Sequence, residues 1–218
     1  MKKNIFALEG EPVRGAIFDL DGVLVDTAKY HYLAWKRLAR ELGFDFTEEN
    51  NERLKGVSRA RSLEILLETG GLSMDEAEKA AAAEKKNAWY VEYLRGLDES
   101  ALLPGSREFL EILRGGGIPR GLGSASKNAP FILERLGISG LFDAVIDGTQ
   151  VSRAKPDPEV FLKCARVLEI PPARCVVFED SLAGIEAAKT GGMRAIAVGK
   201  QENLPGAEKY ISSLQDML

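Results

Sequence analysis

Short apolar runs and amphipathic segments alternate along much of the chain. Four apolar runs end in a polar or acidic residue and are predicted to be buried strands, at 15–19, 120–124, 142–147 and 174–179. Helical patterns lie between the later runs, over 130–136, 158–168 and 183–190. This alternation predicts an α/β fold with a doubly wound parallel sheet. In such sheets ligands bind beyond the carboxyl ends of the strands. The residues predicted to lie at that edge are Asp19, Ser124, Asp147, Glu179 and Asp180.

The segment 29–101 breaks this alternation. It contains helical patterns at 30–42, 61–68 and 75–94 and no strand pattern, and Leu33, Leu38 and Leu42 recur at roughly helical spacing. We therefore predict a small all-helical cap over 29–101, inserted into a core made of 1–28 and 102–218. Because the insertion follows the first strand, both connections should lie beside the ligand edge, a geometry that suits a lid.

Composition narrows the classes of protein that fit. Of 218 residues, 45% are hydrophobic and 28% are charged, as in a globular protein with a proper core. The net charge of -4, without a cluster of Lys and Arg, argues against a nucleic-acid binder and leaves a small anionic ligand possible. The chain shows no signal-like segment and no apolar stretch that could span a membrane. Cys164 and Cys175 lack the spacing of metal or redox sites, so we interpret them as reduced packing residues and expect a cytoplasmic protein. We also expect a monomer.

Two acidic clusters are candidates for chemistry. Asp19 and Asp21 follow the first strand and precede Gly22, so one carboxylate could attack phosphorus while the other transfers a proton. The alternative is an ordinary turn, in which Asp and Gly are common. Glu179 and Asp180 end another strand at the same edge, and converging carboxylates favour Mg²⁺. In the alternative interpretation, Asp180 or Ser181 caps the following helix.

Two further segments could bind phosphate. The run from Ser124 to Asn128 joins a strand to a helix, where backbone N–H groups can bind phosphate oxygens, although Ser124 and Ser126 could instead be helix caps. Lys155 precedes a proline in a stiff turn, and its charge could neutralise Asp19 or a phosphoryl oxygen. Taken alone, such a lysine is commonly a solvated surface charge.

Together, the run from Asp19 to Thr27, Ser124, Lys155-Pro156 and Glu179-Asp180-Ser181 resemble the haloacid-dehalogenase-like phosphotransferase superfamily. The resemblance implies a Rossmann-like core with a helical cap. It also implies that Asp19 becomes a phosphoaspartate and that Asp21 is the general acid and base. The implied ligands of Mg²⁺ are Asp19, the backbone carbonyl of Asp21, Glu179 and Asp180. Ser124 and Lys155 would hold the transferring phosphoryl group.

A narrower resemblance, to the β-phosphoglucomutases of that superfamily, lies in His31, Trp35, the loop 54–59, Lys85-Lys86-Asn87 and the run 124–128. It implies that Arg59 holds a distal phosphate and that Lys86 and His31 lie near the sugar or Asp21. Thr27 is expected to position Asp21 or the hinge, and Trp35 is interpreted as packing. The remaining implied substrate-binding residues are Lys55, Ala125, Ser126, Lys127 and Asn128.

The implied reaction converts β-D-glucose 1-phosphate to glucose 6-phosphate through the phosphoaspartate and a glucose 1,6-bisphosphate intermediate. It would need Mg²⁺, and glucose 1,6-bisphosphate as the phosphorylating activator. One alternative is a sugar-phosphate phosphatase of the same superfamily, against which Arg59, Lys86 and His31 weigh. A remote alternative is a noncatalytic phosphosugar-binding protein, which the intact Asp19 and Asp21 make a poor fit.

Overall fold

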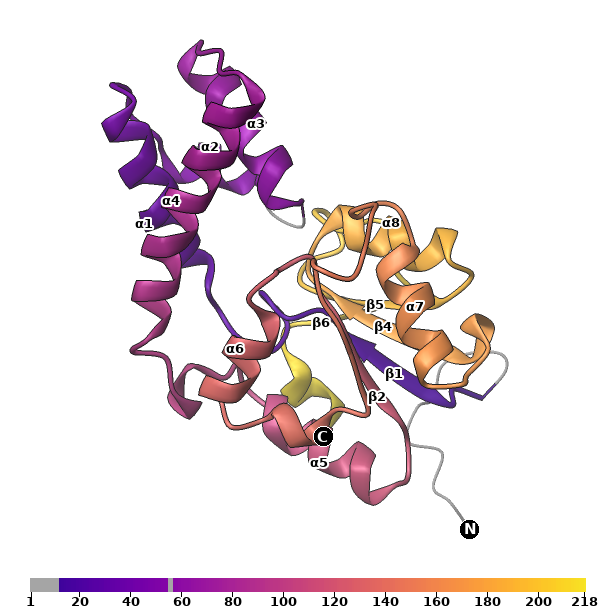
Figure 1. Ribbon diagram of the computed structural model, residues 1–218. Coiled ribbons are helices and arrows are strands. Elements are labelled where there is room, and N and C mark those ends of the chain that lie inside the picture. The colour runs from indigo at the N-terminus through magenta and orange to yellow at the C-terminus, as the bar shows by residue number, and fades with distance from the viewer. Residues whose placement is uncertain (1–11, 55–56) are drawn as a thin grey trace.

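A parallel sheet forms the centre of the molecule in the computed structural model, which describes residues 12–54 and 57–218 (Figure 1). Within these residues the sheet has six strands in the order β3-β2-β1-β4-β5-β6, and every neighbouring pair is parallel. The strands are β1 (Gly15–Phe18), β2 (Arg120–Gly123), β3 (Ala144–Ile146), β4 (Cys175–Glu179), β5 (Arg194–Val198) and β6 (Lys209–Ile211). The predicted doubly wound fold and its four strands are confirmed, whereas β5 and β6 were not predicted.

Helices cover both faces of the sheet. Alternation along β1 sends Phe18 into one apolar layer and Ile17 into the other. The Phe18 ring stacks on Phe178 of β4, with 4.8 Å between ring centroids, and meets Phe109 edge to face. The first layer packs under α5 (Ser106–Gly115) and α6 (Ala129–Arg135), and the second under α7 (Glu159–Val167) and α8 (Leu182–Thr190). Short 3-10 helices lie at Glu99–Ala101, Ser139–Leu141, Pro172–Arg174 and Leu214–Met217.

Four helices stand apart from the sheet (Figure 1). They are α1 (Ala28–Glu41), α2 (Glu48–Glu52), α3 (Arg59–Gly70) and α4 (Glu76–Leu94), and α1, α3 and α4 pack on one another. Asp75 starts α4 with a capping box, because its side chain accepts from the Glu78 amide while Glu78 accepts from the Asp75 amide. Trp35 and Tyr90 are buried between these helices. We refer to α1–α4 as the helical group.

The two connections between the helical group and the sheet lie side by side. Val25 pairs with Leu102 in an antiparallel bridge, and the Leu103 amide donates to the Leu24 carbonyl at 2.9 Å. Arg135 of α6 also donates to the Leu97 carbonyl at 3.1 Å. Both crossings are therefore beside the carboxyl edge of β1, as a lid requires. The boundaries 1–28, 29–101 and 102–218, and movement of the helical group as a cap, stay predictions.

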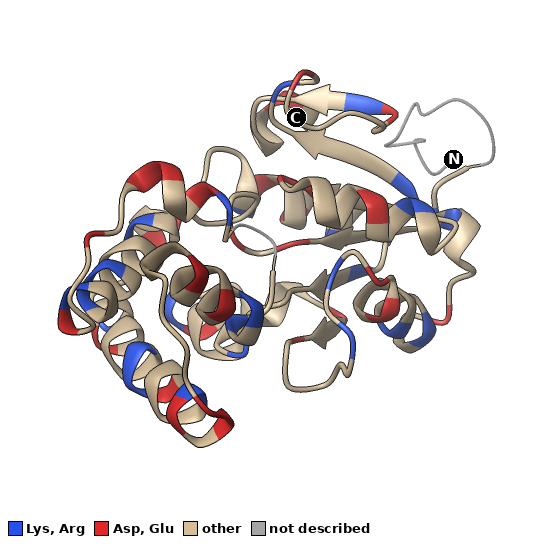
Figure 2. Ribbon diagram, turned by 90° about the horizontal axis from the view of Figure 1, so that it is seen from above, with Lys and Arg blue, Asp and Glu red and all other residues tan. Residues whose placement is uncertain are grey.

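The remaining features of composition can be placed on this fold. Cys164 and Cys175 are buried free cysteines in the layer under α7 and α8. Acidic and basic side chains are interspersed along the helices (Figure 2). Among the described residues, no helix combines the length and the apolar character needed to cross a membrane.

Candidate active site

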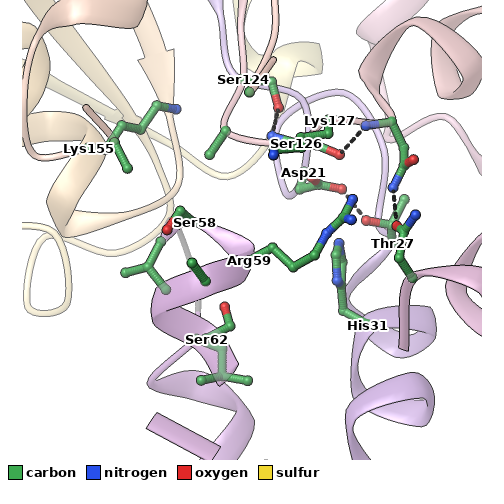
Figure 3. A pocket seen from close by; sticks show the side chains of 18 of the residues that line it. Asp21, Thr27, His31, Ser58, Arg59, Ser62, Ser124, Ser126, Lys127 and Lys155 are labelled. Atoms are coloured by element: carbon green, nitrogen blue, oxygen red, sulfur yellow. Dashed lines mark hydrogen bonds between the residues drawn. The ribbon is translucent and has the colours of Figure 1, made fainter. Parts of the chain in front are cut away.

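A cleft of about 860 Å³ lies between the carboxyl edge of the sheet and the helical group. Its wall brings together nearly every residue singled out in the sequence, namely Asp19, Asp21, Thr27, His31, Arg59, Lys86, Ser124, Ala125, Ser126, Lys127, Asn128, Lys155 and Asp180. Glu179 lies behind this wall, where it bonds to Lys155. Lys55 falls outside the described residues. Figure 3 shows how several of these side chains face the cleft.

Lys155 is a buried cation held between two carboxylates. Its Nζ lies 2.5 Å from Asp19 Oδ1 and 2.8 Å from Glu179 Oε2, and the residue is 4% exposed. Asp19 is fixed in turn by β4, because its amide donates to the Phe178 carbonyl at 3.0 Å. The alternative of a solvated surface lysine is therefore wrong, and the positive charge is fixed beside Asp19.

Negative charge remains in excess at this edge. Burial raises the pKa of Asp19 to about 7, although Lys155 opposes the shift. Burial also raises the pKa of Asp180 well above its ordinary value, and the nearby Glu179 adds to this. Burial opposes the charged form of Lys155, but Asp19 and Glu179 outweigh it and raise the pKa of that lysine. A second cation would relieve this excess of carboxylates.

The chemistry of the donor set fits Mg²⁺. One carboxylate oxygen from each of Asp19, Glu179 and Asp180 lies within 4.8 Å of the others. Mg²⁺ takes oxygen ligands and commonly keeps water together with one or two carboxylates. Glu179 already uses Oε2 for Lys155, and its Oε1 accepts from the Ser181 hydroxyl at 2.7 Å. Asp19 and Asp180 are therefore the better candidates for direct ligation, and direct ligation by Glu179 stays a prediction.

Gly22 permits the close approach on which this cluster depends. Its φ is 82°, a left-handed conformation, and a Cβ there would lie 1.9 Å from Asp180 Oδ2. The Asp180 carboxylate therefore lies directly against the backbone that follows Asp21. This placement supports the expected use of the Asp21 carbonyl as a further metal ligand, which stays a prediction.

Asp21 faces the cleft and is held by Thr27, whose hydroxyl donates a short hydrogen bond to Asp21 Oδ1 (Figure 3). Enclosure by the surrounding residues raises the pKa of Asp21, and the Thr27 hydrogen bond acts in the opposite direction. A carboxyl group with a raised pKa can hold a proton and then transfer it near neutral pH. The Thr27 hydrogen bond fixes the orientation of the Asp21 carboxyl group, whose role as general acid and base stays a prediction.

On the side of the helical group, a lysine and a histidine form a pair. Lys86 Nζ lies 2.9 Å from His31 Nδ1 and 4.4 Å from the centre of the Trp35 ring, and Lys86 is 2% exposed. The His31 ring stacks on Tyr90, with 4.0 Å between centroids. Burial lowers the pKa of both His31 and Lys86 well below their ordinary values, and the nearby cation Arg59 contributes. His31 is therefore neutral at pH 7. Trp35 packs as interpreted, and it also lines the cleft.

Arg59 reaches into the cleft from the first turn of α3, across from His31 of α1 (Figure 3). Its side chain is 20% exposed, and Nη1 lies 3.5 Å from Glu84 Oε2 of α4. The Ser58 hydroxyl caps α3 by accepting from the Arg61 amide at 3.3 Å, which fixes the start of this helix. Arg59 thus brings a guanidinium group from the helical group into the cleft that Asp19 and Asp21 also line.

The serine-rich loop after β2 is arranged by its own side chains. Ser124 Oγ accepts from the Ser126 amide at 3.1 Å, and Ser126 Oγ accepts from the Asn128 amide at 3.2 Å. Neither serine caps α6, whose N-cap residue is Asn128. Asn128 Nδ2 donates to Asn87 Oδ1 of α4 at 3.0 Å, which ties the loop to the helical group.

Two other strand-end residues have structural roles. Ser181 caps α8, because its hydroxyl accepts from the Gly184 amide at 3.1 Å, so the capping alternative holds for Ser181 while Asp180 faces the cleft. Asp147 turns its Oδ1 toward the amide and hydroxyl of Thr149, at 2.7 and 2.6 Å, and does not line the cleft.

The cleft also contains residues that the sequence did not single out. Among them are Asn51, Ser62, Glu84, Ser152 and Arg153. They come from separate helices and loops and share no motif. The sequence pattern of a single helix does not reveal such a shared site, because the packing angle between helices decides which side chains face the cleft.

Comparisons with known proteins agree with this geometry. The family model for haloacid dehalogenase-like hydrolases matches residues 13–192. A β-phosphoglucomutase of Bacillus subtilis is 42% identical over 207 residues, which cover 94% of this chain and 92% of that protein. A phosphorylated carbohydrates phosphatase of Thermotoga maritima is 36% identical over 188 residues, 84% of each chain. The crystal structure of a β-phosphoglucomutase from Clostridium difficile superimposes with a TM-score of 0.91 at 41% identity, covering 94% of this chain and 93% of that one.

Proposed function

The chain belongs to the haloacid dehalogenase-like hydrolase family, and we propose that it is a magnesium-dependent β-phosphoglucomutase. The reaction interconverts β-D-glucose 1-phosphate and glucose 6-phosphate. Asp19 carries the phosphoryl group as a phosphoaspartate. The activator glucose 1,6-bisphosphate supplies that phosphoryl group. The observation that carries this proposal is that Asp19 and Asp21 from the sheet edge and Arg59 from α3 line the same cleft.

In the first transfer, the C6 hydroxyl of β-glucose 1-phosphate attacks the phosphorus of the phosphoaspartate. Asp21 accepts the proton of that hydroxyl, the bond from Asp19 to phosphorus breaks, and glucose 1,6-bisphosphate forms. The bisphosphate then binds in the opposite orientation. Asp19 attacks the phosphorus at C1, Asp21 returns its proton to the leaving oxygen, and glucose 6-phosphate is released with Asp19 phosphorylated again.

The other residues of the cleft position these groups. Lys155, fixed beside Asp19, holds an oxygen of the transferring phosphoryl group together with Ser124. Asp19 and Asp180 would hold Mg²⁺, with the Asp21 carbonyl and Glu179 as expected contributors. When bound, the ion supplies positive charge that neutralises the transferring phosphoryl group. His31 and Lys86 face the sugar.

Arg59 accounts for the second phosphate. A guanidinium group binds a phosphate through two parallel hydrogen bonds, and Arg59 lines the cleft from the helical group. A mutase must hold a bisphosphate in two orientations, whereas a phosphatase needs no clamp on the far end of its substrate. Lys127 and Asn128 line the same cleft and are proposed to bind substrate with Arg59, as are Lys55, Ala125 and Ser126.

Arg59→Ala tests this assignment. Turnover of β-glucose 1-phosphate should fall by about 10²-fold or more, because losing a bidentate charged contact costs a few kcal/mol. Hydrolysis of a small aryl monophosphate, which has no second phosphate, should change much less. Equal losses on both substrates would contradict the clamp and favour the phosphatase. An enzyme should show magnesium-dependent turnover that is lost in Asp19→Ala, whereas a noncatalytic protein would show no turnover.

Two expectations about the setting of the enzyme accompany this proposal. The two buried free cysteines support a cytoplasmic location, where thiols stay reduced. We also keep the expectation of a monomer with a small phosphosugar as its partner, and of no nucleic-acid or membrane partner.

A further inference from the structure

Glu84 is the acidic side chain that α4 contributes to the wall of the cleft within the described residues. Its Oε2 lies 3.5 Å from Arg59 Nη1, and its side chain is 75% exposed, against 20% for Arg59. Glu84 is therefore more open to solvent than the guanidinium group that it contacts, and both line the cleft.

The surroundings of Glu84 leave Arg59 as its partner. The next residue, Lys85, points elsewhere and pairs with Glu41 at 2.5 Å. The positions three and four residues away on α4 are Ala80, Ala81, Asn87 and Ala88, so no basic side chain on this helix face neutralises it. The charge of Glu84 therefore acts mainly on Arg59 and on whatever binds there.

We propose that Glu84 competes with the distal phosphate of the substrate for Arg59 and so weakens the binding of that phosphate. This inference rests on the proposed function, because it takes Arg59 as the phosphate clamp. A phosphate that binds Arg59 must displace Glu84 and then remains near a like charge, so it is held less tightly and released faster. Weak holding suits a mutase, since its bisphosphate must leave the clamp and bind again in the opposite orientation.

The fold does not depend on this contact. The Glu84 side chain is 75% exposed and its contact with Arg59 is long, so solvent screens the pair and it adds little to stability. Glu84→Gln keeps the size and shape of the side chain and removes only its charge. Tighter ligand binding by this variant can therefore be assigned to the lost competition and not to a disturbed helix.

The test measures binding of glucose 6-phosphate with Mg²⁺ by calorimetry, at low and at high salt. Glu84→Gln should bind about two- to tenfold more tightly at low salt, with a smaller gain at high salt where exposed charges are screened. Glu76→Gln is the matched control, because Glu76 lies on the same helix, pairs with Lys79 at 2.7 Å and is 90% exposed outside the cleft. This control should bind as the wild type does.

A second pair of variants separates this inference from the proposed function. In an Arg59→Ala background, most of the gain from Glu84→Gln should disappear. If Arg59→Ala weakens binding but Glu84→Gln does not tighten it, or if Glu76→Gln tightens it equally, the competition is refuted while the clamp stands. If Arg59→Ala leaves binding unchanged, the clamp and the competition both fail. Weaker binding by Glu84→Gln would mean that Glu84 contacts the sugar instead.

Discussion

Replacing Lys155 with methionine removes the one charge that compensates two buried carboxylates. Lys155 Nζ contacts Asp19 and Glu179, and the side chains of Lys155 and Glu179 are each 1% exposed. Methionine fills most of the space of the lysine stem but carries no charge. Asp19 and Glu179 would then remain buried side by side without their cation.

The structure sets the size of the expected loss. Removing one partner of a buried ion pair costs about 3–5 kcal/mol, a large share of the roughly 5–15 kcal/mol by which domains are stable. The loss should be larger at about pH 8 than at about pH 5, because protonation relieves the unpaired carboxylates. Since Lys155 lowers the pKa of Asp19, its removal also leaves the nucleophile more protonated, and turnover should fall by about 10²-fold or more.

Urea unfolding in the presence of a chelator measures the stability term without interference from Mg²⁺. Lys163→Met is the control, because Lys163 pairs with Glu159 at 2.6 Å but is 38% exposed, and its loss should stay within about 1 kcal/mol. A loss below about 1 kcal/mol for Lys155→Met, or one independent of pH, would refute the assignment of Lys155 as a buried counter-ion.

Three further predictions address the remainder of the site. His31 is the single histidine of the chain, and burial lowers its pKa well below the ordinary value, so its ring signal in NMR should stay neutral at about pH 6. Below about pH 6.5 the unfolded chain binds a proton at His31 that the folded chain does not, so the contribution of His31 to stability falls as the pH drops. A titration of the ring near about pH 6.5 in the folded protein would contradict the buried pairing with Lys86. Gly22→Ala should weaken Mg²⁺ binding in calorimetry, because the new Cβ would displace Asp180. Gly43→Ala is the control: Gly43 also has a positive φ, of 90°, but has open space around it, so this change should cost only about 1–2 kcal/mol of stability. Equal Mg²⁺ affinity in both variants would count against Asp180 as a ligand. Asp21→Asn should leave Mg²⁺ binding intact but reduce turnover of sugar phosphate about 10²–10⁴-fold, and near-normal turnover would exclude Asp21 as the acid and base.

Much of the sheet and of its ligand edge could be predicted from the sequence because the relevant signals are local. A buried parallel strand is a short apolar run, and the polar residue that ends it lies at the carboxyl edge whatever the rest of the chain does. Asp19, Ser124 and Asp180 were placed in this way. β6 (Lys209–Ile211) begins at an exposed lysine and lacks a continuous apolar run, and α2 has five residues, fewer than two helical turns.

Contacts between distant segments could not be predicted in the same way. The sequence did not reveal that Glu179 also binds Lys155, because this contact depends on how the loop that carries Lys155 lies against the end of β4. Glu84 and Arg59 are 25 residues apart and meet because α3 packs on α4 at one particular angle. The residues of the helical group that face the cleft thus depend on tertiary packing, which helical periodicity does not specify.

The partition of the phosphoryl group tests the central claim most directly. Purified protein is mixed with Mg²⁺, β-glucose 1-phosphate and a trace of glucose 1,6-bisphosphate, and glucose 6-phosphate and free phosphate are followed in one tube, with Asp19→Asn as the inactive control. A mutase forms glucose 6-phosphate without a matching rise in free phosphate, and the control forms neither. Free phosphate equal to the sugar consumed would show that water intercepts the phosphoaspartate, and the enzyme would be a phosphatase.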